Sequence, residues 1–290
     1  MFEGFERTRI DTTGASIHVR HGGRGPALLL LHGYPQTHVM WAPVAARLAE
    51  HYTVICPDLR GYGDSSKPDG GDDHAAYSKR AMAGDMIEVM NALGHERFYL
   101  AGHDRGARVA HRLALDHEAR VRRLAVLDIV PTHRMFRSTN EALARANFHW
   151  FFLLQPAPVP ERMIGADPDF WLRTLLERWA APGHRWDEAA VAEYLRCFRD
   201  PAAIHATTED YRAAASIDLE HDEADLDRRI ERPVLVLWGG KGRIGRLFDV
   251  LDTWRDRAVD VRGRAMPSGH FVVEEAPEET IDEFLRFFRD

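Results

Sequence analysis

Residues 102–106 (Gly-His-Asp-Arg-Gly) follow an apolar run and precede a helical pattern, so Asp104 stands in a tight turn between two glycines. This is the form of a nucleophile elbow, G-x-S-x-G, with aspartate where serine is usual. Glycine is needed on both sides because the turn is sharp and the strand and helix backbones approach closely. The sequence therefore predicts that Asp104 is a nucleophile.

Aspartate in place of serine changes the chemistry that the elbow can perform. A carboxylate that attacks an ester carbonyl forms an anhydride, which is less stable than the ester. The same carboxylate forms an ordinary ester when it displaces a leaving group from a saturated carbon, and water can then hydrolyse that ester. A carbon–halogen bond or an epoxide is the expected target.

Hydrolysis of an ester on Asp104 requires a general base, which in hydrolases with this chain order is a late histidine. His270 follows the last predicted strand and is the candidate base. The loop 239–244, a common place for the partner acid, contains no carboxylate. Asp128, at the end of the strand after the elbow helix, is the expected acid that orients the imidazole and stabilises its charged form.

Arg105 and Arg108 lie three residues apart in the first turn of the predicted elbow helix, near one face. Cations there oppose the helix dipole at a cost of roughly 0.3–1 kcal/mol each. An anionic substrate would remove this conflict, since arginine can bind a carboxylate through two parallel hydrogen bonds. A short 2-haloacid fits, because its electrophilic carbon lies next to its carboxylate.

A departing halide needs hydrogen-bond donors, and an aromatic segment in the second half of the chain offers them. His149 and Trp150 carry ring N–H groups, and Tyr211 carries a hydroxyl. An epoxide instead leaves as an alkoxide and needs proton donors, for which Tyr194 and Tyr211 are candidates. Both targets remain open at this point.

The elements that must position these residues follow an alternating pattern of strands and helices. Residues 5–20 predict an antiparallel edge hairpin, and apolar runs predict buried strands at 26–31, 52–57, 98–101, 123–130 and 233–238, with a further strand starting at 259–261. Helical patterns cover residues 39–48, 77–93, the elbow helix to about 118, 247–254 and 277–288. This alternation predicts an α/β fold with a mostly parallel central sheet and helices on both faces.

The pattern changes at Pro131, after which the chain is helical and rich in aromatic residues. We expect a helical cap at 132–219, inserted between a first core segment at 1–131 and a second at 220–290. The acidic run 220–227 is expected to be solvated surface rather than a metal site. The glycine-bearing loop 58–68 lacks the ending and the spacing of a phosphate-binding loop.

Composition and charge limit the partners. The 290 residues include 29 % charged residues and carry a formal net charge of −7, which argues against a nucleic-acid partner. No stretch is long enough to span a bilayer, and the start lacks a signal peptide. Cys56 and Cys197 lie in unrelated patterns, which favours free thiols in a reducing cytoplasm.

The motifs together resemble the fluoroacetate dehalogenases, within the α/β-hydrolase superfamily that also contains haloalkane dehalogenases and epoxide hydrolases. The resemblance covers essentially the whole chain, at residues 32–35, 58–64, 102–106 with Arg108, 127–131, 148–150, 210–211 and 269–270. Arginine directly after the elbow aspartate is more specific than the first two motifs, since the other two families usually have tryptophan there, and it is fairly specific together with His149, Trp150 and Tyr211.

The resemblance implies a role for each candidate. These roles are nucleophile, acid and base for Asp104, Asp128 and His270, carboxylate binding for Arg105 and Arg108, fluoride binding for His149, Trp150 and Tyr211, a pocket wall for Trp179, and an oxyanion hole from the backbone N–H groups of Tyr34 and Arg105. It also implies a homodimer. Tyr34 departs from the family pattern, in which phenylalanine is more frequent.

The resulting expectation is a two-step hydrolysis of a haloacetate to a 2-hydroxy acid and halide, with no metal and no organic cofactor. Two alternatives remain. An epoxide hydrolase would use the same nucleophile, and a non-catalytic ligand sensor could share the fold, although no predicted catalytic position is lost in this chain.

Overall fold

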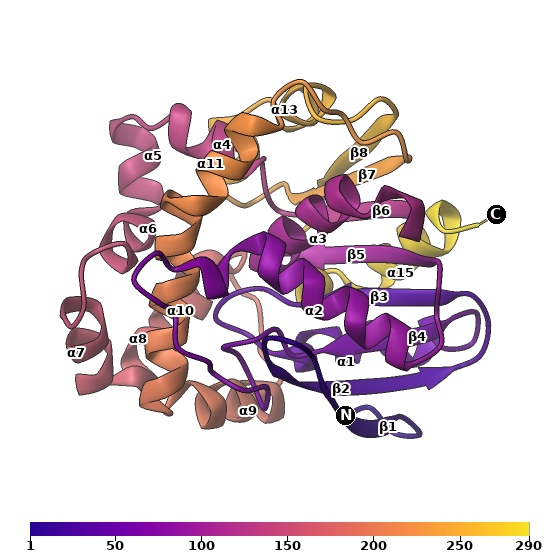
Figure 1. The fold of residues 1–290 in the computed structure, drawn as a ribbon, viewed down its shortest axis with the longest axis horizontal. Helices are drawn as coiled ribbons and strands as arrows, with labels where there is room; N and C mark the ends of the chain where they lie inside the picture. Colours follow the sequence, from indigo (N-terminus) through magenta and orange to yellow (C-terminus); the bar gives the residue numbers. More distant parts are fainter. Residues whose placement is uncertain (290) are drawn as a thin grey trace.

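The structure is a computed structural model that describes residues 1–289, and its core is one eight-stranded sheet (Figure 1). The strands are β1 (Glu6–Asp11), β2 (Ser16–Gly23), β3 (Ala27–Leu31), β4 (Thr53–Pro57), β5 (Phe98–His103), β6 (Val121–Leu127), β7 (Val234–Gly239) and β8 (Val261–Met266). Their order in the sheet is β1-β2-β4-β3-β5-β6-β7-β8. The pairs β1–β2 and β2–β4 are antiparallel and the other neighbours are parallel. The predicted sheet is confirmed.

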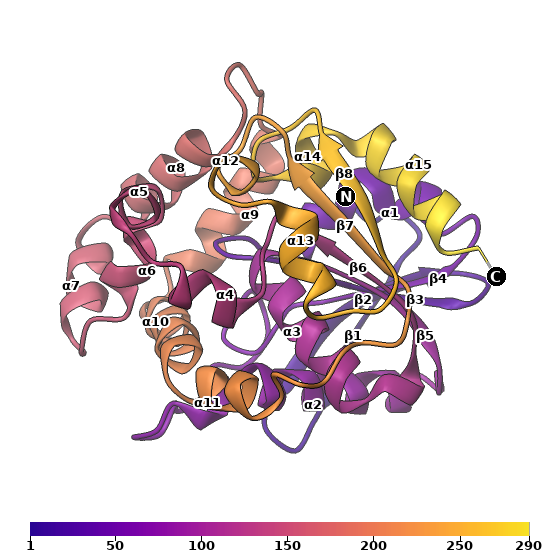
Figure 2. The same cartoon turned by 90° about the horizontal axis from the view of Figure 1, so that it is seen from above.

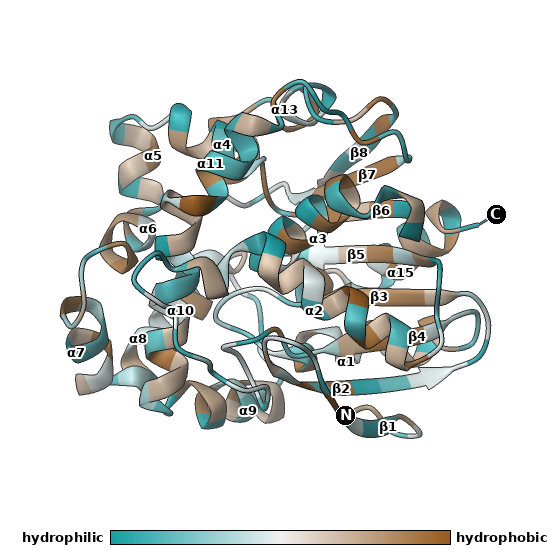
Figure 3. Ribbon diagram, in the orientation of Figure 1, coloured by the Kyte–Doolittle hydropathy of each residue, from teal (hydrophilic) through white to brown (hydrophobic). Residues whose placement is uncertain are grey.

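Helices cover both faces of the sheet, as the unbroken apolar runs require. The core helices are α1 (Ala42–Leu48), α2 (Lys79–Ala92), α3 (Asp104–Asp116), α12 (Ile244–Leu247), α13 (Val250–Arg255), α14 (Val272–Glu275) and α15 (Pro277–Phe287), with 3₁₀ turns η1 (His38–Trp41), η2 (Ala75–Tyr77) and η3 (Glu118–Arg120). Helices α2, α3 and α13 lie on one face and α1 and α15 on the other (Figure 2). Every residue of β3 and β5 is consequently buried, and β3 is brown along its length in Figure 3.

Aromatic contacts hold the layers together. On one face, the ring of Trp254 in α13 meets His111 of α3 edge-on, with ring centroids 5.1 Å apart. On the other face, Trp41 lies 6.3 Å from Phe284 of α15. All four side chains are buried, so each helix buries one apolar face against the sheet.

A second group of helices lies between β6 and β7 in sequence and beyond one end of the sheet, at the left of Figure 1. These helices are α4 (Thr132–Arg137), α5 (Glu141–Ala146), α6 (Phe148–Leu153), α7 (Val159–Ala166), α8 (Pro168–Trp179), α9 (Glu188–Phe198), α10 (Pro201–Ala215) and α11 (Ile217–Ala224). The division into core (1–131, 220–290) and cap (132–219) stays a prediction, and α11 crosses its second boundary. We refer to α4–α11 as the cap.

The acidic run 220–227, which begins in α11, differs in part from its prediction as a solvated surface. Asp222 is buried, and Nη2 of Arg112 in α3 donates to its carboxylate at 2.7 Å. The Nη1 group of Arg112 also donates to Asp225 at 2.5 Å. The expectation was wrong for Asp222, because the buried Arg112 of the elbow helix forms ion pairs with the carboxylates of this acidic segment.

Two of the predicted helices begin or break at capping residues. Ser78 starts α2 by accepting the N–H of Ala81 at 3.1 Å. Asp249 interrupts the predicted helix 247–254, and its side chain accepts the N–H of Asp252 at 3.1 Å, so α13 begins afresh at Val250.

The remaining sequence predictions concern the thiols and the bilayer. Cys56 and Cys197 are both buried and free, as predicted. Within residues 1–289, no helix is both long and apolar enough to cross a membrane.

Candidate active site

The elbow stands where β5 ends and α3 begins, at the carboxyl end of a central parallel strand. The φ angle of Asp104 is 47°, in the left-handed region that side chains rarely adopt. A Cβ on Gly102 would lie 2.5 Å from the carbonyl oxygen of Gly106, and one on Gly106 would lie 2.3 Å from that of His32. The predicted need for glycine therefore has its physical reason in the close approach of the β3, β5 and α3 backbones.

The two carboxylate oxygens of Asp104 have different surroundings. Oδ1 accepts the backbone N–H of Tyr34 at 3.0 Å, whereas Oδ2 lies 3.9 Å from Nε2 of His270. Burial alone would raise the pKa of the Asp104 carboxyl, but electrostatic interactions with His270, His103 and Arg105 lower this pKa below its ordinary value. Asp104 is therefore ionised at neutral pH, as a nucleophile must be.

Asp128 and His270 come together from the ends of β6 and β8. Nδ1 of His270 lies 2.6 Å from Oδ2 of Asp128, and Oδ1 of Asp128 accepts the N–H of Gly239 at 2.8 Å. Asp128 also has a left-handed backbone, with a φ of 51°. The loop 239–244, which contains no carboxylate, thus contributes the N–H of Gly239. This N–H helps to fix the carboxylate of Asp128 at the end of β6.

The loop that carries His270 is attached to the cap. The backbone N–H of His270 donates to the carbonyl of Trp179 at 2.9 Å. The Glu275 carboxylate accepts the N–H groups of Gly269 (2.8 Å), Phe271 (2.9 Å) and Ala181 of the cap (2.7 Å). A charged acceptor with three backbone donors holds the histidine loop and the end of α8 together.

Arg105 and Arg108 are buried, and each has some of its N–H donors already bound. Nε and Nη2 of Arg105 donate to the Asp210 carboxylate at 2.9 and 2.7 Å, and Nη1 has no partner. Nη1 of Arg108 donates to the carbonyl of Val130 and the hydroxyl of Thr132, while its Nε has no partner. Asp210 takes two parallel hydrogen bonds of Arg105, so only Nη1 is left for a substrate carboxylate, and the carboxylate-binding role of both arginines stays a prediction.

The cap residues His149, Trp150 and Tyr211 lie around these arginines. Cζ of Arg105 is 4.2 Å from the ring centroid of Tyr211, and Cζ of Arg108 is 4.6 Å from that of Trp150. The rings of His149 and Tyr211 are 6.0 Å apart, and those of Trp150 and Tyr211 are 5.6 Å apart. The three predicted donors therefore come together with both arginines.

Electrostatics keep two of these donors neutral. Burial lowers the pKa of His149 well below its ordinary value, and the charge of Arg243 lowers it further. Burial and the Asp104 carboxylate raise the pKa of the Tyr211 phenol well above 10. Tyr211 thus keeps its proton to donate, and His149 is an uncharged imidazole.

Several polar atoms of the predicted residues are buried without a hydrogen-bond partner. They are Nη1 of Arg105, Nε of Arg108, Nδ1 of His149, the hydroxyl of Tyr211 and Nε2 of His270. Buried polar atoms almost always have partners, and exceptions call for an explanation. A small ligand with a negative charge would satisfy this set, because the two arginines and the protonated phenol of Tyr211 are hydrogen-bond donors.

Aromatic rings enclose the same space. The ring of Trp179 lies 4.5 Å from that of His149 and 5.3 Å from that of His270, so it contacts both a candidate halide donor and the candidate base. The ring of Tyr34 lies 5.5 Å from Tyr211, and its hydroxyl accepts the indole N–H of Trp171 at 2.6 Å. The hydroxyl that distinguishes Tyr34 from the family pattern therefore bonds to cap helix α8.

Tyr194, the second candidate proton donor for an epoxide, donates its hydroxyl hydrogen bond outside the group formed by Asp104 and the two arginines. Its hydroxyl donates to Glu274 at 2.7 Å, and Gln36 also hydrogen-bonds this carboxyl. Burial raises the pKa of Glu274 to about 8. Tyr194 thus belongs to a buried junction between cap and core, and only Tyr211 of the two phenols has an unpartnered hydroxyl.

Sequence reasoning missed Arg243. Its guanidinium lies 4.7 Å above the ring of Trp179, its Nη1 donates to the carbonyl of Ala146 at 2.6 Å, and the side chain is half-buried. Burial lowers the pKa of Arg243, which the charges of Asp128 and Asp104 partly oppose. The available signal is a basic residue in the loop 239–244, at the carboxyl end of a parallel strand.

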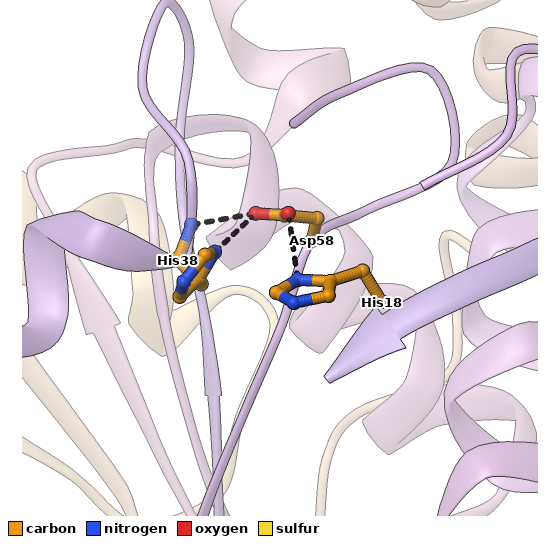
Figure 4. A group of neighbouring side chains, drawn as sticks. All are labelled: His18, His38 and Asp58. Atoms are coloured by element: carbon orange, nitrogen blue, oxygen red, sulfur yellow. Dashed lines mark hydrogen bonds and ion pairs between the residues drawn. The ribbon is translucent and has the colours of Figure 1, made fainter. Parts of the chain in front are cut away.

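His18, His38 and Asp58 form the one group with metal-ligand geometry found within residues 1–289 (Figure 4). Nδ1 of His38 lies 2.8 Å and Nδ1 of His18 3.1 Å from the Asp58 carboxylate, which also accepts the N–H groups of His38 and Asp64. A Cβ on Gly63 would lie 2.2 Å from that carboxylate. These hydrogen bonds use the atoms that a metal would need, so the cluster serves to fold the loop 58–64.

Comparisons with known proteins agree with this architecture. A family model described as alpha/beta hydrolase fold matches residues 26–277. A fluoroacetate dehalogenase from a Burkholderia species is 51 % identical over 291 residues, which cover 100 % of this chain and 96 % of that protein. A soluble epoxide hydrolase from a Corynebacterium species is 36 % identical over 95 % of this chain and 94 % of the relative.

Solved structures give the same result. The crystal structure of a protein from Nostoc sp. PCC 7120, described provisionally as an alpha/beta hydrolase, matches with a TM-score of 0.98 at 59 % identity and covers 99 % of both chains. The predicted resemblance, fold and hydrolase class are confirmed. The chain belongs to the α/β-hydrolase fold family.

Proposed function

We propose that the chain hydrolyses short 2-haloacids, with fluoroacetate converted to glycolate and fluoride. The observation that carries this proposal is the set of unpartnered buried donors on Arg105, Arg108 and Tyr211 beside an ionised elbow carboxylate. A haloacetate carries a carboxylate that the two arginines can bind. Its carbon–halogen bond is on the carbon next to that carboxylate, where Asp104 can attack. The 51 % identical relative, a fluoroacetate dehalogenase, supports the same substrate class.

In the first step, Oδ2 of Asp104 attacks the carbon next to the substrate carboxylate, and the halide leaves with the bonding electron pair. Oδ1 is held by the N–H of Tyr34, which supports Oδ2 as the attacking atom. Arg105 and Arg108 align the carbon with Oδ2, and His149, Trp150 and Tyr211 stabilise the charge that develops on fluoride.

In the second step, Nε2 of His270 takes a proton from water and the resulting hydroxide attacks the carboxyl carbon of Asp104. The oxyanion forms on Oδ1, at the N–H groups of Tyr34 and Arg105, and glycolate leaves as the ester bond breaks. Asp128 stabilises the imidazolium that forms on His270. The imidazolium gives its proton to the alkoxide oxygen of the departing glycolate, and the new carboxyl group of Asp104 loses its proton to solvent. Every step uses residues of the chain and water.

The test is halide release from fluoroacetate and chloroacetate, with Asp104→Asn as the blank. Fluoride released by the unmodified chain and absent with the variant supports both the reaction and the nucleophile. Chloride release alone keeps the mechanism but removes the claim on the C–F bond. Absence of both halides, with folded protein, contradicts the proposal.

An epoxide hydrolase is the second candidate, favoured by the unpartnered phenol of Tyr211 and by the 36 % identical relative. Diol formation from a panel of small epoxides would reveal it. The hydrogen bond of Tyr194 to Glu274 counts against a pair of phenols formed by Tyr194 and Tyr211. A homodimer and a cytoplasmic location stay predictions, and sedimentation would check the first.

A further inference from the structure

The carboxylate of Asp210, in cap helix α10, is completely buried and has donors at both oxygens. Oδ1 accepts from Nη2 of Arg105 at 2.7 Å and forms an ion pair with Lys79. Oδ2 accepts from Nε of Arg105 at 2.9 Å and from the hydroxyl of Tyr62 at 2.6 Å. A carboxylate has about four acceptor positions, so the coordination of Asp210 is complete.

The same contacts define what Arg105 has left to offer. Nη2 donates to the backbone carbonyl of Asp210 at 2.8 Å as well as to its carboxylate. Three of the five N–H groups of Arg105 are thereby directed at Asp210. The two N–H groups on Nη1 remain, on a buried atom with no partner.

Burial makes this arrangement costly unless every charge is compensated. Burial acts to lower the pKa of Arg105, but the Asp210 carboxylate raises it above its ordinary value. Burial acts to raise the pKa of Asp210, but Arg105 and Lys79 lower it below its ordinary value. Both groups are therefore charged, and each depends on the other to remain so in the interior.

We propose that Asp210, itself held by Tyr62 and Lys79, is a positioning residue that fixes Arg105 so that Nη1 alone faces the substrate carboxylate. This inference rests on the proposed function. A buried ion pair that served only to join cap and core would leave no donor unsatisfied, whereas Nη1 of Arg105 is unpartnered. The geometry thus assigns one part of Arg105 to Asp210 and the other to the ligand.

Asp210→Asn removes the charge but keeps the size of the side chain. An asparagine has one oxygen, so it cannot accept from both Nε and Nη2 of Arg105 as the carboxylate does. Arg105 keeps its charge, so attraction of the substrate persists while its orientation is lost. We expect kcat for chloroacetate to fall by about 10–100-fold with KM changed by less than about threefold, since misplacement of about 1 Å can cost about 10²-fold.

The experiment is a double-mutant cycle on chloride release with Asp210→Asn, Arg105→Lys and the double variant. If Asp210 acts through Arg105, the loss in the double variant is smaller than the product of the two single losses. Losses that multiply would overturn the proposal. Glu209→Gln is the matched control, since Glu209 is a buried acid of the same helix that pairs with Arg212 and His74 instead.

A milder variant decides the matter if Asp210→Asn does not fold. Tyr62→Phe removes one hydrogen bond to Asp210 and leaves Arg105 in place. We expect kcat to fall by about fivefold, the effect of roughly 1 kcal/mol. An unchanged kcat with Tyr62→Phe, in folded protein by circular dichroism, would overturn the positioning role.

Acetate binding separates this proposal from the proposed function. Tryptophan fluorescence can report acetate, because Trp150 lies 4.6 Å from Cζ of Arg108. If the unmodified chain neither binds acetate nor releases halide, the proposed function fails. If it does both and Asp210→Asn does both equally well, only the positioning role fails.

Discussion

Nδ1 of His270 lies 2.6 Å from Asp128, while Nε2 of the same ring lies 3.9 Å from Oδ2 of Asp104. The short contact fixes the ring, and the long one exceeds hydrogen-bond distance. Nε2 is buried with no partner. The imidazole is thus anchored to one carboxylate and oriented toward the other, which suits a base that acts on water beside an Asp104 ester.

Removal of the proposed base, His270, should trap the proposed ester intermediate. His270→Ala leaves Asp104 and its hydrogen bond to Tyr34 in place, so the first step proceeds and the second slows by about 10²–10⁴-fold. Intact mass spectrometry after incubation with chloroacetate should show a carboxymethyl group added to the protein. The double variant with Asp104→Asn is the control, and an adduct there, or none with His270→Ala, would contradict the scheme.

The proposed halide donors should matter more for release of fluoride than for release of chloride, because fluoride is the poorer leaving group. Tyr211→Phe should lower fluoride release by about 10²-fold, comparable to the loss of one oxyanion donor, and chloride release by less. Parallel rates with fluoroacetate and chloroacetate measure this difference. Tyr77→Phe removes a buried phenol that donates to Pro68 instead, and it should leave both rates unchanged.

Arg243 should assist the approach of an anion to a protein with a net charge of −7. Its side chain is half-buried above Trp179, so its charge reaches both solvent and site. Arg243→Gln should lower kcat/KM for chloroacetate by about tenfold at low salt and weaken its dependence on ionic strength. Arg246→Gln, in the next turn of the chain and exposed, is the matched control; an equal effect there would dismiss a specific role for Arg243.

Glu274 should make the stability of the fold depend on pH. Burial raises its folded pKa from 4.5 to about 8, so between these values the folded chain binds more protons than the unfolded one. The free energy of unfolding therefore falls as pH rises through this window, by at most about 1.4 kcal/mol per pH unit from this group. Glu274→Gln should flatten that decline in urea unfolding at pH 5–8. The exposed Glu278→Gln should not, and an unaltered slope with Glu274→Gln would refute the linkage.

The strands and the elbow could be predicted because they depend on local signals. Unbroken apolar runs mark β3 and β5, and the glycines around Asp104 follow from backbone crowding that any such turn has. The pairing of Asp128 with His270 was predicted by elimination, since residues 239–244 hold no acid, and the hydrogen bond of 2.6 Å agrees with it.

The partner of Arg105 could not be predicted in the same way. Asp210 lies 105 residues further along the chain and on a cap helix, so no local pattern links the two. The positive charges of Arg105 and Arg108 predict a negative charge near the start of the elbow helix. From the sequence we expect that charge on the substrate, whereas Asp210 supplies part of it. For Asp222, the run of acidic residues in the sequence suggests a solvent-exposed side chain. The sequence does not show that the buried Arg112, on another helix, binds the Asp222 carboxylate.

Both Asp104 and Asp128 hold their carboxylates on a left-handed backbone, with φ angles of 47° and 51°. That conformation costs a side-chain-bearing residue roughly 1–2 kcal/mol, and glycine adopts it freely. Glycine at either position would relieve this backbone strain. It would also leave the backbone N–H of Tyr34 or of Gly239 without its carboxylate acceptor, so each aspartate offsets its own strain with a hydrogen bond that no glycine can make.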